Sequence, residues 1–502
     1  MKTSALFCAL SLALGARAAA AETIKVRIYH TNDIHGWIMP RPDKFQPQRL
    51  IGGGAALASL ISKEAGPKLV LDAGDWWQGT PEGSLSKGEA VADVFNAIGY
   101  DAVVIGNHEY DAGGDALRSL IGKMKMPVLS ANTYGEDGKL VPWVRPWIVK
   151  EVAGVKLGIF GLTTSHMSRL AFPKHIKGLT FRREVDEARD AVKALKNAGA
   201  TVIIAVTHIG VEKEGDHFEG DQTIAREVAG IDLIVGGHSH TFLSRPIRDS
   251  ANGTMIVQAG AYLVKVGRAV LEIDPKTKKV VASSDELLDL WPDRVGENIE
   301  LKEITAKHVA TVGRVFETVV ANAPAVLARA ADRESALGDW MADCYREQLG
   351  VDVALQNGGG IREDMPAGPV TLRVLFNVMP FDNALVKLSM TGEALREAFE
   401  HGVGMARSVQ ISGAALEGRR SRPRGKRLAA AAVGGAPLDD AKMYTVAALD
   451  FMTDGGDGYS AFDHFVSSEA TGLLARDLLG ECARKQARIV APAAGRLIFR
   501  ED

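Results

Sequence analysis

The 502-residue chain contains only three cysteines, Cys8, Cys344 and Cys482. So few cysteines exclude a protein built on a disulfide framework. The chain also lacks an excess of one charge, because 62 acidic residues are balanced by 59 basic ones. A global basic field, typical of proteins that bind nucleic-acid polymers, is therefore absent. No internal hydrophobic run is long enough to span a bilayer, and the length favours two globular domains.

Residues 1–21 have the pattern of a secretory signal peptide. A positive start is followed by a short apolar core at residues 6–14 and by small residues that predict cleavage near Ala21. The apolar run is too short for a membrane anchor, so we expect a periplasmic or secreted protein. Cleavage would remove Cys8. The two remaining cysteines are then permitted, but not required, to form a disulfide.

From residue 24 to about 275, strand-like and helix-like segments alternate, which indicates an α/β layered domain. The helix-like segments are residues 57–63, 91–98, 116–125, 185–197 and 223–229. Residues 295–325 form a polar, helix-compatible stretch, after which the α/β pattern restarts. We therefore predict a catalytic domain at 22–294, a linker helix at 295–325 and a second α/β domain at 326–502.

Metal-ligating side chains follow five strand-like runs of the first domain. They are Asp33 and His35 after residues 24–29, Asp75 after 69–72, Asn107 after 103–106, His208 after 201–207, and His238 and His240 after 231–237. Loops at the carboxyl ends of buried parallel strands commonly carry function. Carboxylate, imidazole and amide ligands without thiolate suit Zn, Mn, Fe, Co or Mg. The pattern predicts a two-metal site in which Asp75 bridges both ions.

The same segments carry motifs that resemble a known family. The strings TNDIHG at 31–36, GD at 74–75, GNHE at 106–109, TH at 207–208 and GHSH at 237–240 are similar to the five motifs of calcineurin-like metallophosphoesterases. GNHEYD at 106–111, followed by NGGGIR at 357–362, resembles more narrowly the 5′-nucleotidase family, which includes bacterial periplasmic UDP-sugar hydrolases and animal ecto-5′-nucleotidase. The resemblance covers nearly the whole mature chain and implies an αββα sandwich for the first domain.

The resemblance also implies roles for individual residues. One metal ion would take Asp33, His35 and His240, and the other Asn107, His208 and His238, with Asp75 shared. Some bacterial members carry Gln at the position of His240. His108 is expected to stabilise the phosphoryl group in the transition state, and Asp111 to orient His108. The ions are expected to be divalent, namely Zn, Mn, Co or Mg.

In the second domain, Phe381 and Phe451 match the aromatic pair that sandwiches a nucleobase in the family. Asp457 would lie by the ribose hydroxyls, while Asn357 and Arg362 would contact the base or the sugar. One departure concerns the two arginines that family members often carry just before the helix-like stretch at 336–345. Here those positions hold Ala331 and Arg333, which leaves Arg333 as the one candidate cation there.

These observations predict an exported two-metal phosphohydrolase that releases phosphate from nucleoside 5′-monophosphates, with UDP-sugars and di- or triphosphates as further candidates, by attack of a metal-bound hydroxide. One alternative is a sulfur-oxidation-type thiohydrolase, which the string WWQG at 76–79 resembles. Others are a 2′,3′-cyclic nucleotide phosphodiesterase and a non-catalytic nucleotide-binding protein. The six basic residues within 419–427 predict a solvated turn between strands, with a polyanion-binding patch as the alternative.

Overall fold

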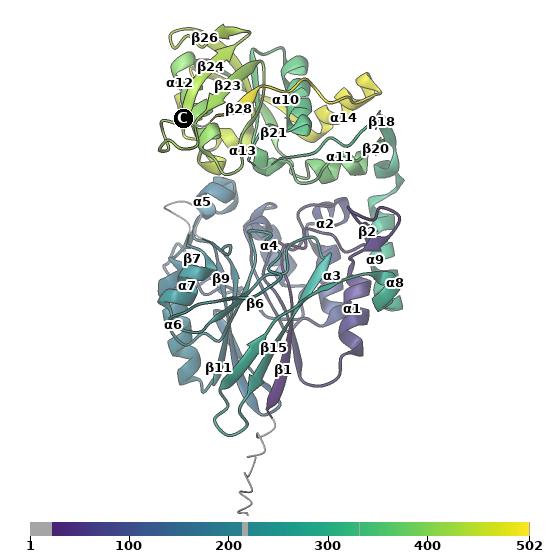
Figure 1. The fold of residues 1–502 in the computed structure, drawn as a ribbon, viewed down its shortest axis with the longest axis vertical. Coiled ribbons are helices and arrows are strands. Elements are labelled where there is room, and N and C mark those ends of the chain that lie inside the picture. Colours follow the sequence, from purple (N-terminus) through teal and green to yellow (C-terminus); the bar gives the residue numbers. More distant parts are fainter. Residues whose placement is uncertain (1–22, 213–218, 331, 501–502) are drawn as a thin grey trace, which may run out of the picture.

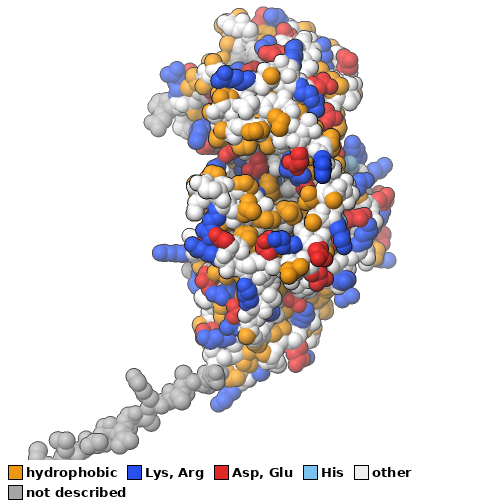
Figure 2. All heavy atoms as spheres, turned by 90° about the vertical axis from the view of Figure 1, so that its right-hand side faces the viewer, with side chains coloured by type: hydrophobic (Ala, Val, Ile, Leu, Met, Phe, Trp, Pro, Cys, Tyr) orange, Lys and Arg blue, Asp and Glu red, His pale blue; other side chains and the backbone are white. Residues whose placement is uncertain are grey.

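The computed structural model describes residues 23–212, 219–330 and 332–500. The predicted signal peptide at residues 1–21 lies outside the described residues. Two domains are stacked end to end, with the N-terminal domain in the lower half of Figure 1 and the C-terminal domain in the upper half. Figure 2 shows charged side chains of both signs interspersed over the visible face, consistent with the balanced charge of the sequence. No helix in the described ranges is long and apolar enough to cross a membrane.

Two β-sheets form the centre of the N-terminal domain. The first has the order β16-β15-β1-β4-β5-β6, with β17 paired to β15. Its strands are β1 (Ile24–Thr31), β4 (Lys68–Asp72), β5 (Ala102–Val104), β6 (Val128–Leu129), β15 (Lys265–Ile273), β16 (Val280–Ser284) and β17 (Leu287–Asp289). The second has the order β13-β14-β12-β11-β9-β8. Its strands are β8 (Trp147–Val152), β9 (Val155–Thr163), β11 (Val202–His208), β12 (Leu233–Gly236), β13 (Ile247–Arg248) and β14 (Met255–Val257).

The two sheets pack face to face and each is covered by helices on its outer side. Alternate residues of the strands, such as Ile28 in β1 and Val206 in β11, share one buried cluster between the sheets. A second cluster joins the first sheet to the helices α1 (Gly54–Lys63), α3 (Glu89–Ile98) and α4 (Gly114–Ile121). A third joins the other sheet to α6 (Glu184–Asn197) and α7 (Asp221–Glu227). The predicted αββα sandwich is confirmed.

Helix α4 ends at Ile121, four residues before the end of the predicted helix at 116–125. The last helical hydrogen bond of α4 runs from the Gly122 backbone N–H to the Arg118 carbonyl oxygen. A second difference is β5, which spans Ala102–Val104 and stops before the glycine at 106. Both differences are small shifts at the ends of elements, where sequence patterns are least informative.

The chain passes between the domains within residues 312–319. Helix α9 (Ile299–Val312) begins at Asn298, whose side chain accepts a hydrogen bond from the Leu301 backbone N–H at 3.0 Å. It packs against α1, α2 (Pro81–Leu85) and α3 of the N-terminal domain. A 3-10 helix, η3 (Arg314–Glu317), follows, and β18 (Val319–Ala323) then pairs with β20 (Gly368–Thr371) of the C-terminal domain. Figure 1 shows α9 along one side of the molecule.

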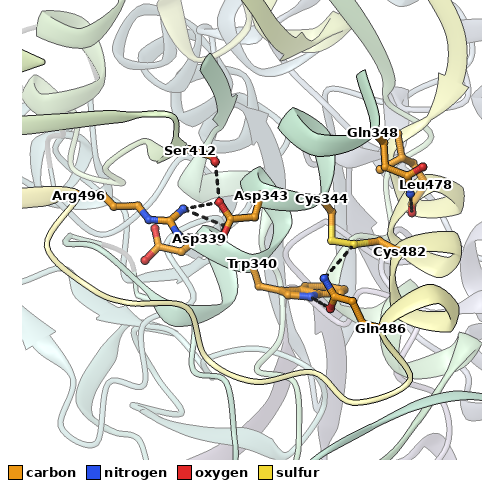
Figure 3. Close-up of a disulfide and its surroundings, with 10 residues drawn as sticks. All are labelled: Asp339, Trp340, Asp343, Cys344, Gln348, Ser412, Leu478, Cys482, Gln486 and Arg496. Carbon is orange, nitrogen blue, oxygen red and sulfur yellow. Dashed lines mark hydrogen bonds and ion pairs between the residues drawn. A yellow bond between two sulfur atoms is a disulfide. The ribbon is translucent and has the colours of Figure 1, made fainter. Parts of the chain in front are cut away.

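The C-terminal domain is built on a five-stranded sheet with the order β22-β19-β26-β21-β27. These strands are β19 (Val353–Gln356), β21 (Ala384–Thr391), β22 (Gln410–Ser412), β26 (Met443–Leu449) and β27 (Ser467–Leu474). The helices that share its core are α10 (Ala336–Leu349), α11 (Leu372–Val378), α12 (Gly392–Gly404), α13 (Asp450–Thr453) and α14 (Ala475–Gln486). A disulfide between Cys344 of α10 and Cys482 of α14 closes this core, as Figure 3 shows. The sequence had left this pairing open.

The basic residues at 419–427 form a turn, as predicted. They connect β23 (Ala414–Gly418) to β24 (Leu428–Val433), which pair in antiparallel register. The turn is tied to α12 because Glu400 accepts a hydrogen bond from the Arg427 backbone N–H at 2.8 Å. The Arg427 guanidinium donates to the Gly404 carbonyl at 2.9 Å. With β25 (Ala436–Pro437) and β28 (Leu497–Phe499), these strands make a four-stranded sheet.

Candidate active site

The predicted metal ligands meet at the edge of the sandwich where β1, β4, β5, β11 and β12 end. Five of the seven adopt a left-handed backbone, with φ of 51° at Asp33, 51° at His35, 58° at Asp75, 77° at His238 and 54° at His240. Side-chain-bearing residues rarely adopt this conformation, and it costs of order 1–3 kcal/mol per residue. Such strain concentrates where a fold must aim side chains at a common point, so this backbone marks a functional site.

Asp33, His35 and His240 form the first cluster, with ligand atoms that all lie within 4.8 Å of one another. The Nε2 atoms of His35 and His240 are 3.0 Å apart, and His240 Nε2 is 3.1 Å from Asp33 Oδ1. Asp75, His208 and His238 form the second cluster, within the same limit. Each cluster offers the mixed carboxylate and imidazole donors that divalent transition metals prefer.

Asp75 lies between the two clusters. Its Oδ2 is 3.1 Å from His208 Nε2 in the second cluster and 3.8 Å from His35 Nε2 in the first. Asn107 lies on the side of the second cluster, because its Oδ1 is 3.0 Å from His238 Nδ1 and 3.3 Å from His208 Nε2. The structure thus brings all seven predicted ligands together in the grouping that the family resemblance implies.

Backbone carbonyls orient two of the histidines. The Nδ1 of His35 lies 2.7 Å from the Gln78 carbonyl oxygen, and the Nδ1 of His208 lies 2.7 Å from that of Ala73. A carbonyl can only accept, so each Nδ1 carries the proton and each Nε2 faces the centre of the site. Fixing the tautomer through the outer nitrogen is the usual support for a metal-binding histidine.

Asp33 provides a direct test of whether these residues suit a metal ion. Its Oδ2 accepts hydrogen bonds from Asn32 Nδ2 at 2.6 Å and from the His238 backbone N–H at 3.0 Å. Its Oδ1 is buried without a hydrogen-bond partner among the described residues and points to the first cluster. An unsatisfied buried carboxylate oxygen is costly, and a cation removes that cost. The residues therefore fit a bound divalent ion.

The protonation states of four ligands, His35, His238, His240 and Asp75, also suit metal binding. His208 differs, because burial is outweighed there by the Asp75 carboxylate, which raises the pKa of His208 to about 10. Burial holds the pKa of His35 and His240 well below its usual range and lowers that of His238 to about 3. Burial alone would raise the pKa of Asp75, but the nearby His208 and His108 outweigh it and hold that pKa well below its usual value. Neutral imidazoles and an ionised carboxylate are the forms that ligate metals.

Two glycines make room for the second cluster. A Cβ at Gly106 would lie 2.3 Å from Asp75 Oδ1, and one at Gly74 would lie 2.7 Å from His208 Nδ1. No side chain fits at either position without displacing a ligand. Packing therefore explains the glycines of the Gly-Asp and Gly-Asn-His-Glu motifs, in addition to the chemistry of their polar residues.

His108 and Asp111 form a hydrogen-bonded pair beside the clusters. His108 Nδ1 lies 2.8 Å from Asp111 Oδ2, so the carboxylate accepts from Nδ1–H and directs Nε2 toward the metal ligands. His108 Nε2 is 4.0 Å from Asp75 Oδ2, and its side chain is 14% exposed. It can therefore reach a ligand at the clusters from the open side. The arrangement suits an imidazole that stabilises charge on a bound phosphoryl group.

One cavity of about 1140 Å³ connects the metal ligands to the C-terminal domain. Five of the six predicted substrate-side residues line it, namely Asn357, Arg362, Phe381, Phe451 and Asp457. Asn357 Nδ2 donates to Asp457 Oδ2 at 2.6 Å, which fixes both side chains on one wall. Gly359 lies beside this pair, so the wall has no bulky side chain at that point.

Arg362 and Arg333, the two predicted cations, lie in different settings. The Arg362 side chain is buried, and its Nη2 lies 3.0 Å from His35 Nε2, so it extends from the C-terminal domain into the first metal cluster. The Arg333 side chain is 73% exposed and lies 3.4 Å from the Asp332 carboxylate. It does not line the cavity. The structure therefore brings Arg362 to the site and leaves Arg333 outside it.

Three further residues contribute to the site although the sequence did not single them out. Arg407, in the loop after α12, lines the cavity. Its positive charge contributes to lowering the pKa of His238 and His240 and opposes the rise in the pKa of Asp457. Phe172, from the N-terminal domain, meets the Phe451 ring edge-on with centroids 5.8 Å apart. Glu109 accepts from the backbone N–H groups of Asp75, Trp76 and Gly106 at 2.7–2.9 Å and so joins two ligand-bearing loops. Of these three residues, only Glu109 could have been found from the sequence, because it belongs to the Gly-Asn-His-Glu motif.

Known proteins resemble the chain over both domains. Residues 26–242 match the calcineurin-like phosphoesterase family, and residues 312–464 match the 5′-nucleotidase C-terminal domain. A snake venom 5′-nucleotidase from Gloydius brevicauda is 30% identical, over 98% of this chain and 91% of that protein. Protein UshA from Escherichia coli is 28% identical, over 91% of this chain and 90% of that protein.

A solved structure agrees with this assignment. The 5′-nucleotidase precursor from Thermus thermophilus superposes with a TM-score of 0.88 at 28% identity, and the match covers 95% of this chain and 99% of that one. The similarity therefore includes both domains and their connection. Together with the two ligand clusters, it supports binding of divalent metal ions. The chain belongs to the 5′-nucleotidase family of calcineurin-like phosphoesterases and is a metal-dependent phosphohydrolase.

Proposed function

We propose that this protein is exported and releases inorganic phosphate from nucleoside 5′-monophosphates. The observation that carries the proposal is the single cavity that joins the two metal-ligand clusters to an aromatic pair on the opposite domain. Residues 22–294 would carry the chemistry and residues 326–502 would select the substrate, joined by residues 295–325. The signal-like residues 1–21 support a periplasmic or secreted location.

In this proposal the phosphate is held at the clusters. Asp33, His35 and His240 would hold one divalent ion, Asn107, His208 and His238 the other, and Asp75 would contact both. When bound, such a pair supplies positive charge to the phosphate oxygens and activates a water molecule. Zn, Mn, Co and Mg are the candidate ions.

The chain's own side chains then orient and stabilise the reacting phosphate. His108 would donate from Nε2 to a phosphate oxygen, while Asp111 keeps the proton on Nδ1 and the ring in place. The sequence predicted a contact of Arg362 with the base or the sugar, but its side chain reaches the first cluster. Arg407 lines the same cavity, so in this proposal both arginines meet phosphate oxygens from the second domain. In this proposal Arg407 adds a positive charge that acts on His238 and His240 at the clusters.

The second domain would recognise the nucleoside. Phe381 and Phe451 offer the base two aromatic faces, and stacking on such faces contributes roughly 1–3 kcal/mol per base with little preference among bases. Asp457, held by Asn357, would accept from the ribose hydroxyls. Base-tolerant stacking predicts activity on several nucleoside monophosphates.

A substrate panel tests the proposal. The purified mature protein is loaded with each of the four metals and given AMP, UMP, a UDP-sugar, ATP, a 2′,3′-cyclic nucleotide, an aryl phosphate or a thioester-linked sulfonate. Released phosphate is measured, and the other products are identified by chromatography. Hydrolysis of AMP with a higher kcat/KM than that of the aryl phosphate is expected. Turnover of the cyclic nucleotide alone, or of a thioester-linked sulfonate and no nucleotide, would replace the proposal with one of the alternative enzymes.

A further inference from the structure

The cavity extends beyond the space that a nucleoside monophosphate needs. Its volume of about 1140 Å³ exceeds the roughly 300–1000 Å³ that is usual for small-molecule sites. Besides the metal ligands and the aromatic pair, it is lined by residues of α12 and of the basic turn at 419–427. This outer part of the cavity, next to His401, Arg424 and Lys426, has no role in the proposed reaction.

Contacts on the cavity wall show which part of a nucleotide would face this outer space. Asn357 and Asp457 are hydrogen bonded at the proposed ribose position. The next residue outward is His401 of α12, whose Nε2 lies 2.9 Å from the Asp457 carbonyl oxygen. Burial lowers the pKa of His401; Asp457 opposes this, and the charges of Arg169 and Arg424 add to it. Both arginines line the same cavity as His401. The wall therefore leads from the ribose hydroxyls to a group of cations.

Four cationic side chains line the outer part of the cavity from two segments of the chain. Arg169 and Lys174 come from the segment of the N-terminal domain that contains α5 (Met167–Leu170) and η2 (Pro173–His175). Arg424 and Lys426 come from the basic turn. Across the parts of the chain that the structure describes, none of these four forms an ion pair, although Lys174 Nζ lies 5.0 Å from the Phe172 ring centroid.

Two glutamates also line the outer space, but other groups already bind their carboxylates. Glu400 accepts hydrogen bonds from the backbone N–H groups of Arg427 and Leu428. Glu397 lies 3.0 Å from His464 Nδ1. Asp450 also lines the cavity, and its charge acts together with that of Lys174 on His175 and Asp454. Arg169, Arg424 and Lys426 have no ion-pair partner among the described residues, so the space next to His401 favours an anion.

We propose that this space is a second anion subsite, which binds a phosphate on the 3′-oxygen of a nucleotide whose 5′-phosphate lies at the metal clusters. The inference rests on the proposed function, because it takes its orientation from the ribose at Asp457. The substrate class is the nucleoside 3′,5′-bisphosphates. In the reaction, water adds to the 5′-phosphorus, the bond from that phosphorus to the 5′-oxygen breaks, and the leaving oxygen takes up a proton. The products are inorganic phosphate and a nucleoside 3′-monophosphate.

The test compares adenosine 3′,5′-bisphosphate with AMP as substrates of the full mature enzyme. We expect the wild type to have the higher kcat/KM for the bisphosphate, with adenosine 3′-monophosphate as the product. The double variant Arg424→Ala/Lys426→Ala should lower the ratio of the two kcat/KM values at least fivefold. Both side chains are exposed, so the substitutions leave the packed core unchanged. The preference should weaken as ionic strength rises.

Arg420→Ala is the matched control. It removes one positive charge from the same turn, but Arg420 lies over the Phe499 ring at 3.8 Å and does not line the cavity. This variant should keep the wild-type ratio. An unchanged ratio in the double variant, or release of the 3′-phosphate instead of the 5′-phosphate, would overturn the subsite. If neither AMP nor the bisphosphate is hydrolysed with any metal, the proposed function fails and the subsite with it; AMP hydrolysis without a preference for the bisphosphate overturns the subsite alone.

Discussion

The phenyl ring of Phe381 stacks on the imidazole of His108, with ring centroids 5.4 Å apart and planes at 28°. A residue of the C-terminal domain thus packs directly on the residue that we expect to stabilise the transition state. Phe451, the other member of the aromatic pair, meets Phe172 instead. The two phenylalanines therefore have different neighbours and should have different effects when they are removed.

Phe451→Ala should weaken nucleotide turnover selectively. Loss of one stacking face, at roughly 1–3 kcal/mol, lowers kcat/KM for AMP by about 5- to 150-fold. Aryl phosphate hydrolysis should change less than about twofold, because its ring is joined directly to the phosphate and lacks the ribose that carries a nucleobase out to Phe451. Steady-state kinetics on both substrates checks this. Equal losses on both would contradict a role of Phe451 in base binding.

Phe381→Ala is the informative comparison for that experiment. It removes a stacking face and also the packing that holds His108. We expect kcat for the aryl phosphate to fall together with kcat/KM for AMP, in contrast to the Phe451 variant. If the aryl phosphate is hydrolysed as in the wild type, the contact between Phe381 and His108 has no part in positioning the imidazole.

His108→Ala should lower kcat while the enzyme keeps its metal ions. His108 is held by Asp111 and its Nε2 faces the clusters, but it is not one of the seven grouped ligands. Removal of a single preorganised donor from a reacting oxyanion costs roughly 10²–10³-fold in kcat. Kinetics and elemental analysis of the same preparation test this. Loss of metal from the variant would assign His108 to the ligand set.

Asp75→Asn should lose metal and activity together. The Asp75 carboxylate lies between both clusters, so its neutral amide weakens the binding of both ions. Even residues behind the ligands change metal affinity by about 10- to 100-fold, so a shared ligand should cost at least about 100-fold. Elemental analysis after dialysis against a fixed metal concentration gives the stoichiometry. Two tightly bound ions in the variant would show that Asp75 is not shared.

Much of this site was predictable from the sequence for a physical reason. Ligands such as Asp33 and His208 follow buried strands directly, and the parallel arrangement brings the strand ends to one edge whatever the details of the helices. Arg407 and Phe172 could not be found in this way. They lie on irregular segments, and only the packing of one domain on the other brings them to the cavity.

The same limit applies to the cysteines and to Arg333. The pairing of Cys344 with Cys482 depends on α10 lying beside α14, a contact between segments 138 residues apart that no local pattern encodes. Arg333 precedes α10 as the family pattern requires, yet its side chain points to solvent. The position of Arg333 in the sequence predicted that it lies near the site. The direction of its side chain depends on the conformation of the backbone around it, which the sequence pattern does not give.

The disulfide should stabilise the C-terminal domain. Cys344→Ser/Cys482→Ser frees a loop of 138 residues in the unfolded chain, which corresponds to roughly 3–5 kcal/mol of stability. We expect a lower Tm and a transition that no longer responds to reductant, with AMP hydrolysis retained at low temperature because neither sulfur lines the cavity. Calorimetry of the wild type with and without reductant provides the control. Equal Tm values for variant and wild type would argue that the bond does not form in solution.

Asp339, near the start of α10, should make the stability of the protein dependent on pH. Its side chain is buried beside Glu334, and one of its oxygens has no hydrogen-bond partner among the described residues. Burial, opposed by Arg496 and reinforced by Glu334, raises the pKa of Asp339 to about 8. Glu334 stays ionised, because it accepts from the backbone N–H groups of Gly495 and Arg496. A protonated Asp339 is therefore the favoured partner of that carboxylate.

The folded protein consequently holds a proton on Asp339 that the unfolded chain, with a pKa of about 4, releases. Between pH 4 and 8 the folded state binds more protons, so this group's stabilising contribution is present below pH 4 and is lost as the pH rises toward 8. Asp339→Asn supplies a permanent N–H donor of the same shape to Glu334. We expect the variant to have a higher Tm than the wild type at pH 8, and the difference to shrink as the pH is lowered to 5. Parallel curves of Tm against pH for the two proteins would contradict a protonated Asp339 in the fold.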